Sequence, residues 1–172
     1  MNGGLHLRRG ARSLTSRVAG AHALQAYHGA VDIDYAVLAD HAEVVGNKLY
    51  LMGGGWDTVG ANEAPAPVRL AIAAGVRIEW DETNVPIPVL ITIDDDDAQE
   101  VLRLQAEVNM GRPPGLPAGS SQLSQVAATV QVSLPRFGGY RVNVIAGGGE
   151  SEVRRELPFR LVRRGQPQTR PA

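Results

Sequence analysis

Apolar and polar residues alternate with a period of two along most of the chain from residue 68 onward. Every even position from Val68 to Ile78 is apolar, whereas the odd positions include Arg69, Arg77 and Glu79. Successive side chains of a β-strand point to opposite faces of a sheet, so this alternation indicates strands with one buried face and one solvated face. Five further runs repeat the pattern, at residues 85–93, 102–110, 126–134, 140–144 and 153–161. The alternation favours antiparallel pairing, because strands of parallel sheets are usually apolar throughout.

The breaks between these runs contain the residues that form turns. Gly, Pro, Asn and Asp are concentrated in segments 80–84, 94–97, 111–117, 135–139 and 147–149. We therefore predict an all-β fold over residues 31–162, an antiparallel β-sandwich of seven to nine strands with an immunoglobulin-like or C2-like layout. Tyr140, which follows two glycines, matches the tyrosine at the corner of such sandwiches, whose hydroxyl bonds back to the chain.

Three consecutive glycines occur in the segment LYLMGGGWDTV, residues 49–59, and raise the question of a phosphate-binding loop. Such a loop requires a helix directly after the glycines. Here a β-prone segment follows, and then Pro65 and Pro67. We interpret the glycines as a bulge or kink in an extended segment from Lys48 to Val59. Trp56 is expected to cover the core where the glycines leave room.

The two ends of the chain differ in composition from the middle. Residues 1–30 contain four arginines and no acidic residue, which is typical of a disordered extension or a misplaced translation start. An ordered helical appendage at residues 14–27 and a targeting peptide are the alternatives. Residues 163–172 are predicted to form a disordered tail.

Charge and composition exclude several classes of function. Residues 31–172 contain 13 basic and 18 acidic residues, a net charge of about −5, so we expect no binding to nucleic acid. The chain has no cysteine, which excludes disulfides, thiolate catalysis and cysteine-ligated metals and is compatible with the cytoplasm. Because no apolar run approaches the roughly 18 residues of a membrane span, we expect no membrane insertion.

Four consecutive aspartates, Asp94, Asp95, Asp96 and Asp97, form the densest charge in the sequence. Calcium prefers six to eight oxygen ligands, and aspartates on sandwich loops can supply them. The segment lacks the glycine and the terminal glutamate of an EF-hand loop, so a solvated hairpin turn is the competing interpretation. A metal would need acids from a second loop, and Asp81, Glu82 or Asp57 are the available residues.

Catalytic chemistry has few candidates in this sequence. Asp40 and His41 are adjacent, and a site built from them and Asp57 would make the protein an enzyme of unfamiliar type. A catalytic zinc usually takes three protein ligands, and His41 is the single histidine after residue 31. The serine-hydrolase motif Gly-x-Ser-x-Gly is also missing. We therefore expect no catalytic residues and no cofactor.

The segment GRPPGLP at residues 111–117 is the candidate for partner binding. Proline fixes φ and lowers the entropy lost on ordering, so a rigid exposed loop is expected. The candidate contact residues are Arg112, Pro113, Pro114, Leu116 and Pro117. A plain connector is the alternative.

Three segments of the chain resemble a family of small uncharacterised bacterial β-sandwich proteins, a domain of unknown function. They are DYAVLADHAEV at residues 34–44, GNKLYL at 46–51 and GGGWDTV at 53–59, and the closing segments GYRV and LPFRLV are similar too. The resemblance spans about residues 34–162 and implies a fold without an activity.

The expected function is a non-catalytic binding or assembly module. Its partner is an unidentified protein or a second copy, because the edge strands of a sheet invite pairing. A divalent-cation-dependent ligand-binding domain at Asp94–Asp97 is the first alternative, and an uncharacterised enzyme is the second.

Overall fold

The computed structural model describes residues 31–165, and the predicted N-terminal extension and most of the predicted tail lie outside this range. The described part contains ten strands, against the seven to nine expected. They are β1 (Val31–Ala39), β2 (His41–Val45), β3 (Lys48–Met52), β4 (Thr58–Ala61), β5 (Ala66–Ile78), β6 (Ile87–Asp95), β7 (Glu100–Val108), β8 (Gln122–Leu134), β9 (Gly138–Ala146) and β10 (Val153–Arg163). Two single 3₁₀ turns, Trp80–Glu82 and Gly149–Ser151, are the helical elements among these residues.

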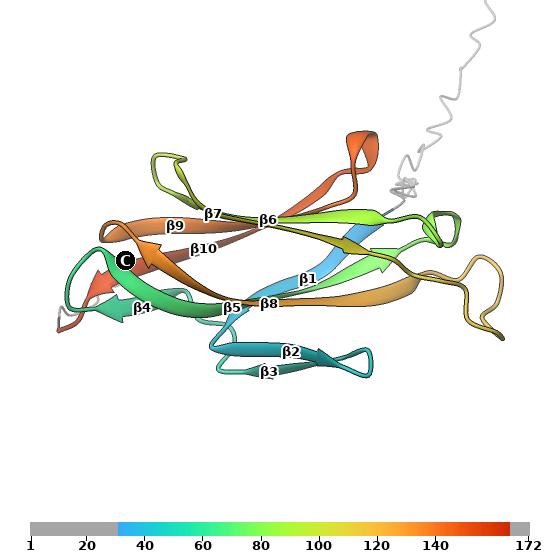
Figure 1. Cartoon of the computed structure of the whole chain (residues 1–172), viewed down its shortest axis with the longest axis horizontal. Coiled ribbons are helices and arrows are strands. Elements are labelled where there is room, and N and C mark those ends of the chain that lie inside the picture. Colours follow the sequence, from blue (N-terminus) through green and yellow to red (C-terminus); the bar gives the residue numbers. More distant parts are fainter. Residues whose placement is uncertain (1–30, 166–172) are drawn as a thin grey trace, which may run out of the picture.

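Two facing sheets form the body of the molecule (Figure 1). One has the strand order β1-β5-β8 and the other β4-β10-β9-β6-β7. Every paired strand within them is antiparallel except β4, which pairs with β10 in parallel. The antiparallel β-sandwich predicted from the alternation is therefore confirmed. Within residues 31–165, no helix is long and apolar enough to cross a membrane.

The core between the sheets contains most apolar positions of the alternating runs, whereas Val85 and Ala106 are exposed. The even positions of β5 from Val68 to Ile78 are buried, as are the odd positions of β6 from Ile87 to Ile93. Phe159 of β10 is the largest fully buried side chain. Trp56 packs on its ring edge-on, with centroids 6.1 Å apart, so the residue after the three glycines covers the core as predicted.

The glycines at 53–55 separate β3 from β4, and two of them require a left-handed backbone. Gly53 and Gly55 have φ values of 62° and 86°. A Cβ on Gly53 would lie 2.1 Å from the carboxylate oxygen Oδ2 of Asp40. The predicted kink is therefore present, and it turns the chain from the hairpin β2–β3 back to the body.

A β-bulge in β1 changes which face its side chains occupy. Ile33 lies opposite Val76, but Tyr35 lies opposite Gly75, so Asp34 is the extra residue. Tyr35 consequently lies on the outer face of the sheet, where a Cβ on Gly75 would be 2.4 Å from its ring. Arg77 donates hydrogen bonds to Asp34, which lowers the pKa of that carboxyl group.

Tyr140 forms the predicted corner. It is 3% exposed. Its hydroxyl donates a hydrogen bond to the Arg136 carbonyl at 2.6 Å and accepts one from the Arg136 N–H at 3.2 Å. Its ring stacks on Phe159 at a centroid distance of 5.4 Å. The turn between β8 and β9 is therefore tied to the core.

Candidate functional site: an exposed apolar hairpin

Strands β2 and β3 form a hairpin that belongs to neither main sheet. Their connection is a two-residue turn, Gly46-Asn47, with φ values of 56° and 61°. Two positive φ values define a type I′ turn, whose twist matches that of paired strands. The register places Val45 opposite Lys48 and Glu43 opposite Tyr50.

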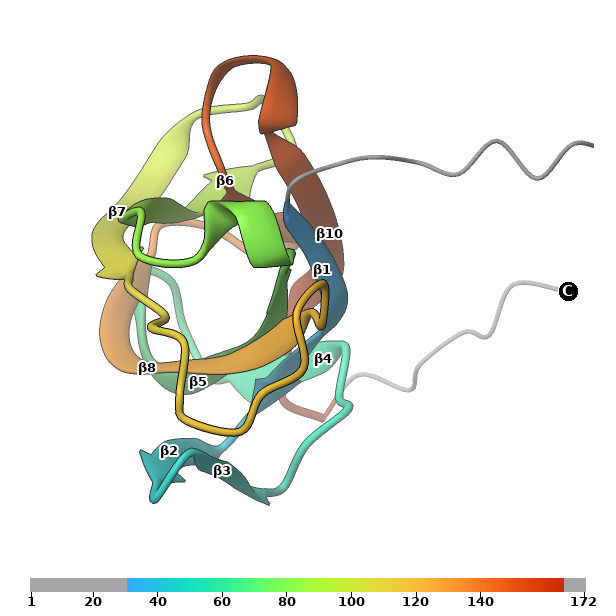
Figure 2. The same cartoon turned by 90° about the vertical axis from the view of Figure 1, so that its right-hand side faces the viewer.

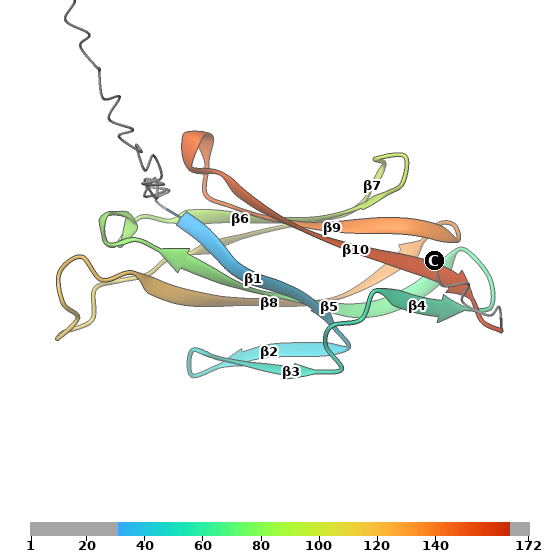
Figure 3. The same cartoon turned by 180° about the vertical axis from the view of Figure 1, so that it is seen from behind.

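The hairpin covers part of the outer face of the three-stranded sheet and adds a third layer to the sandwich. Figures 1 and 3 show it on the side away from the five-stranded sheet, with β3 farther from the body than β2, and Figure 2 shows the same arrangement along the long axis. The buried residues of this contact are all alanines, 6% exposed or less, with Val37, Leu49 and Ala127 packed around them: Ala39, Ala42, Ala71 and Ala73. Alanines let the two layers approach closely. Most of the contact is between β2 of the hairpin and strands β5 and β8 of the sheet.

Large apolar side chains are exposed on this hairpin. Within residues 31–165, six large apolar residues are exposed, and five of them belong to β2 and β3. These five are Val44, Val45, Tyr50, Leu51 and Met52. We call them the hairpin patch. The sixth, Val85, lies in the connection before β6.

The hairpin patch occupies both faces of the small sheet. Val45, Tyr50 and Met52 point to solvent, and they are 54%, 50% and 67% exposed. Val44 and Leu51 alternate with them and point toward the body, yet they are still 39% and 40% exposed. The hairpin is therefore only partly covered by the sheet beneath it.

Among residues 31–165, β2 and β3 pair only with each other, so each strand of the hairpin has one edge to which no other strand is paired. In a two-residue turn the flanking pair, here Val45 and Lys48, is hydrogen-bonded, and hydrogen-bonded pairs then alternate along the ladder. The backbone N–H and C=O groups of Leu49 and Leu51 consequently point to the open edge of β3. Such an edge is a template for pairing with another strand.

The four aspartates at 94–97 end β6 and form the turn to β7, in the place expected for them. Asp94 accepts a hydrogen bond from the Asn143 amide at 2.6 Å, and Asp96 accepts one from the Gly139 N–H at 2.8 Å. Asn143 is 4% exposed, so its contact with Asp94 is part of the structure of the sheet. These two carboxylates therefore accept hydrogen bonds from different residues of β9.

Asp95 and Asp97 are held by Arg136. The guanidinium contacts Asp95 at 2.9 Å and Asp97 at 2.5 Å, and the hydrogen bond with Asp97 raises the Arg136 pKa. Asp95 also caps the turn, because its Oδ1 accepts bonds from the backbone N–H groups of Asp97 and Gln99 at 2.9 Å. Within residues 31–165, no three His, Asp or Glu side chains are grouped to hold a metal. The calcium site stays a prediction that this arrangement does not favour.

A cleft of about 400 Å³ lies beside this turn. Of the second-loop acids considered for a metal, Asp57 lines this cleft with Asp94, Asp95 and Asp96, whereas Asp81 and Glu82 do not; Arg141 and Arg160 line it too. Asp40 and His41 are not part of this cleft, so the three residues of the enzyme hypothesis are not brought together in it.

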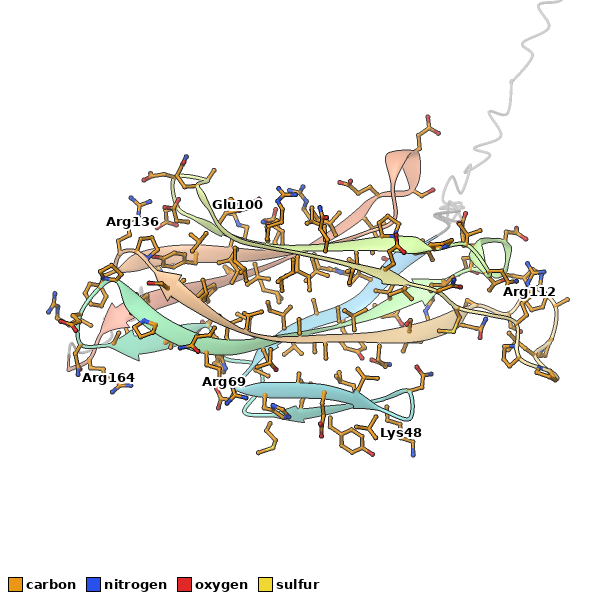
Figure 4. All side chains as sticks on the ribbon, in the orientation of Figure 1. Lys48, Arg69, Glu100, Arg112, Arg136 and Arg164 are labelled. Atoms are coloured by element: carbon orange, nitrogen blue, oxygen red, sulfur yellow. The ribbon has the colours of Figure 1, made fainter. Side chains whose placement is uncertain are left out.

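The proline-containing loop 111–117 lies at the opposite end of the molecule from Arg136 (Figure 4). Arg112 turns back onto the body, where its guanidinium lies 4.4 Å from the Trp80 ring and donates hydrogen bonds to Thr83 Oγ1 and the Trp80 carbonyl. Pro113, Pro114 and Pro117 are exposed and Leu116 is half-buried. Arg112 thus anchors the loop, and partner binding by Arg112, Leu116 and the three prolines stays a prediction.

Sequence reasoning did not single out the hairpin as a site. The dipeptide Gly46-Asn47 between two apolar segments is a signal for a two-residue hairpin. The alternation in β5 contained a second signal, because Ala71 and Ala73 occupy positions where a solvated face would have polar residues. Together these two features predict a third layer over the sheet.

Comparison with known proteins gives one family and several distant folds. A family model described as "Family of unknown function (DUF6941)" matches residues 34–161, and no curated protein matches the chain. Among solved structures, the C-terminal domain of wzt is similar at 11% identity and a TM-score of 0.41, over 78% of this chain and 74% of that one. A structural-genomics target, SoR45, is similar at 10% identity and a TM-score of 0.33, over 83% of this chain and 94% of that one.

A β-glucuronidase from glycoside hydrolase family 2 is similar at 14% identity and a TM-score of 0.36. The match covers 76% of this chain but only 11% of the glucuronidase.

Proposed function

The chain belongs to DUF6941, a family of unknown function, as the resemblance in its sequence indicated, and we propose that it is a non-catalytic protein-binding module that docks through the β2–β3 hairpin. One observation carries the proposal: five of the six large apolar side chains exposed within residues 31–165 lie on this hairpin. Single exposed apolar residues are ordinary, whereas a concentration of them in one element marks an interaction surface.

The residue types in the hairpin patch support a protein partner. Tyr and Met are enriched at the centres of protein interfaces, because they bring large contact areas at low cost. Tyr50 and Met52 lie next but one to each other on β3 and point to the same side. Lys48 and Glu43 lie on that face and have opposite charges. The surface therefore has no strong positive electrostatic potential that would attract a polyanion.

The hairpin contributes little to the core of the sandwich. A two-stranded hairpin alone is marginal in water, and this one is attached to the sheet mainly through alanines. Val45, Tyr50 and Met52 point to solvent and lie outside the packing of the sandwich. A binding role explains why these apolar side chains are exposed. We also propose that the protein is located in the cytoplasm, because the chain has no cysteine.

An affinity capture with three matched proteins tests the proposal. The full chain, a Tyr50→Ser/Met52→Ser variant and a Val85→Ser variant are immobilised and exposed to native lysate and to untagged chain. Val85 is the matched control because it is 46% exposed but lies outside the hairpin. We expect a partner retained by the full chain and by Val85→Ser and lost by the hairpin variant. Equal retention by all three proteins, or no partner for any, would overturn the proposal.

A further inference from the structure

The open edge of β3 has the composition of a self-pairing strand, and from it we infer that the hairpin's partner is a second copy of this chain. In the proposed dimer, β3 pairs antiparallel with β3 of the second copy about a two-fold axis at Tyr50. The result is a continuous four-stranded sheet with the order β2-β3-β3-β2. This inference rests on the proposed function, because it names the partner of the same surface.

Charge selects β3 over β2 as the pairing edge. Both strands have five residues, so full antiparallel overlap of a strand with its own copy is centred on the third residue. For β2 this centre is Glu43, and two carboxylates would lie directly opposite each other, which is destabilising. For β3 the centre is Tyr50, and an aromatic pair at such a position is favourable.

The other pairs along β3 are compatible with the same register. Lys48 would lie opposite Met52 of the second copy, and Leu49 opposite Leu51. The N–H and C=O groups of Leu49 and Leu51 already point to this edge, so the two copies exchange backbone hydrogen bonds there. Tyr50 then occupies a non-hydrogen-bonded pair, in which the Cα atoms are about 4.5 Å apart.

The dimer covers the apolar side chains that the monomer leaves exposed. Leu51 points toward the body but is 40% exposed, and the second copy would place Leu49 beside it. Tyr50 and Met52, at 50% and 67% exposure, would form the centre of the outer face. The outermost strands of the four-stranded sheet are then the two copies of β2, where Glu43 discourages further pairing, so the assembly closes at two chains.

Disulfide trapping tests the register directly, because the chain has no cysteine of its own. The Tyr50→Cys variant of the full chain is oxidised under dilute conditions, and Glu43→Cys is the matched control at the centre of β2. A Cα separation of about 4.5 Å is within the range that a disulfide spans. We expect covalent dimer from Tyr50→Cys at least about tenfold faster than from Glu43→Cys, given the proximity of the paired residues. Equal rates would overturn the inference.

A charge swap at position 52 gives a second readout that does not depend on oxidation. Met52→Glu places a carboxylate opposite Lys48 of the second copy, whereas Met52→Lys places two ammonium groups there. Both variants lose the same apolar side chain at a site that is 67% exposed, so both should fold. By symmetry each change acts twice, and we expect the Met52→Glu dimer to be roughly 5- to 20-fold tighter than the Met52→Lys dimer in sedimentation velocity.

Net charge alone predicts the opposite order. The chain carries −1, so Met52→Glu makes two copies repel more strongly and Met52→Lys makes them neutral. A tighter Met52→Lys dimer, or a full chain that sediments as a monomer at every concentration, would overturn the inference. If a different protein is nevertheless captured through Tyr50 and Met52, the proposed docking surface stands and only the identity of its partner is wrong.

Discussion

Removing one hydroxyl group from the β8–β9 corner should destabilise the protein measurably. Tyr140→Phe keeps the ring that stacks on Phe159 at 5.4 Å and deletes only the oxygen that bonds to Arg136. Tyr140 is 3% exposed, so water does not replace the lost partner easily. The variant therefore isolates the two hydrogen bonds of the corner.

The expected loss follows from these two bonds. A hydrogen bond contributes about 1 kcal/mol net, and a buried group left without its partner costs about 1–3 kcal/mol. The two bonds share one residue, Arg136, whose 2.6 Å carbonyl contact is the stronger. We expect the free energy of unfolding to fall by about 2 kcal/mol and the Tm to fall by roughly 6–10 °C.

Urea unfolding followed by tryptophan fluorescence is the assay. Trp56 lies 6.1 Å from Phe159, so its emission reports on the same part of the core. Tyr50→Phe, which removes a hydroxyl from a half-exposed ring, is the control and should unfold like the unmodified chain. A Tyr140→Phe variant within about 0.5 kcal/mol of the unmodified chain would refute the reasoning that the corner stabilises the fold.

Three further predictions concern the charged groups. The hydrogen bonds from Arg77 lower the Asp34 pKa, so the carboxylate stabilises the fold above its unfolded pKa and this contribution disappears as the pH falls through the folded one. Asp34→Asn should cost about 0.5 kcal/mol at pH 7, with a smaller difference in urea melts below about pH 4; an undiminished difference in acid would contradict this. Calcium at millimolar concentration should leave the Tm unchanged, because the carboxylates at 94–97 already have protein partners; a rise of several degrees would instead support the calcium site. Arg112→Ala should shift Trp80 fluorescence and speed proteolysis of loop 111–117, and unchanged cleavage would show that Arg112 does not anchor the loop.

Much of the sandwich could be predicted from the sequence because its main strands are long and each has one buried face. The alternation in β5 and β6 identified the residues that now form the core, and the turn residues identified the breaks. Tyr140 could be placed because its hydroxyl bonds to a residue only four positions away, which makes the corner a local motif.

Features that depend on distant segments could not be predicted in the same way. The parallel pairing of β4 with β10 joins Thr58 to Arg160, and no local pattern reports such a contact. The bulge at Asp34 changes which face of the sheet the later side chains of β1 occupy. The bulge is defined by the register of β1 with β5, so the sequence of β1 alone does not reveal it. The candidate site was missed for a related reason: the exposure of the apolar residues in β2 and β3 depends on how the hairpin packs on a sheet formed by distant segments.

Hydrogen exchange of the full chain tests the central claim, that the β2–β3 hairpin is the docking surface. Exchange is followed by mass spectrometry in dilute and in concentrated protein, and again in the presence of any captured partner. The account predicts slower exchange in the complex at the Leu49 and Leu51 amides, which point to the open edge of β3. Unchanged exchange throughout 41–52, together with protection at loop 111–117 or elsewhere, would contradict it.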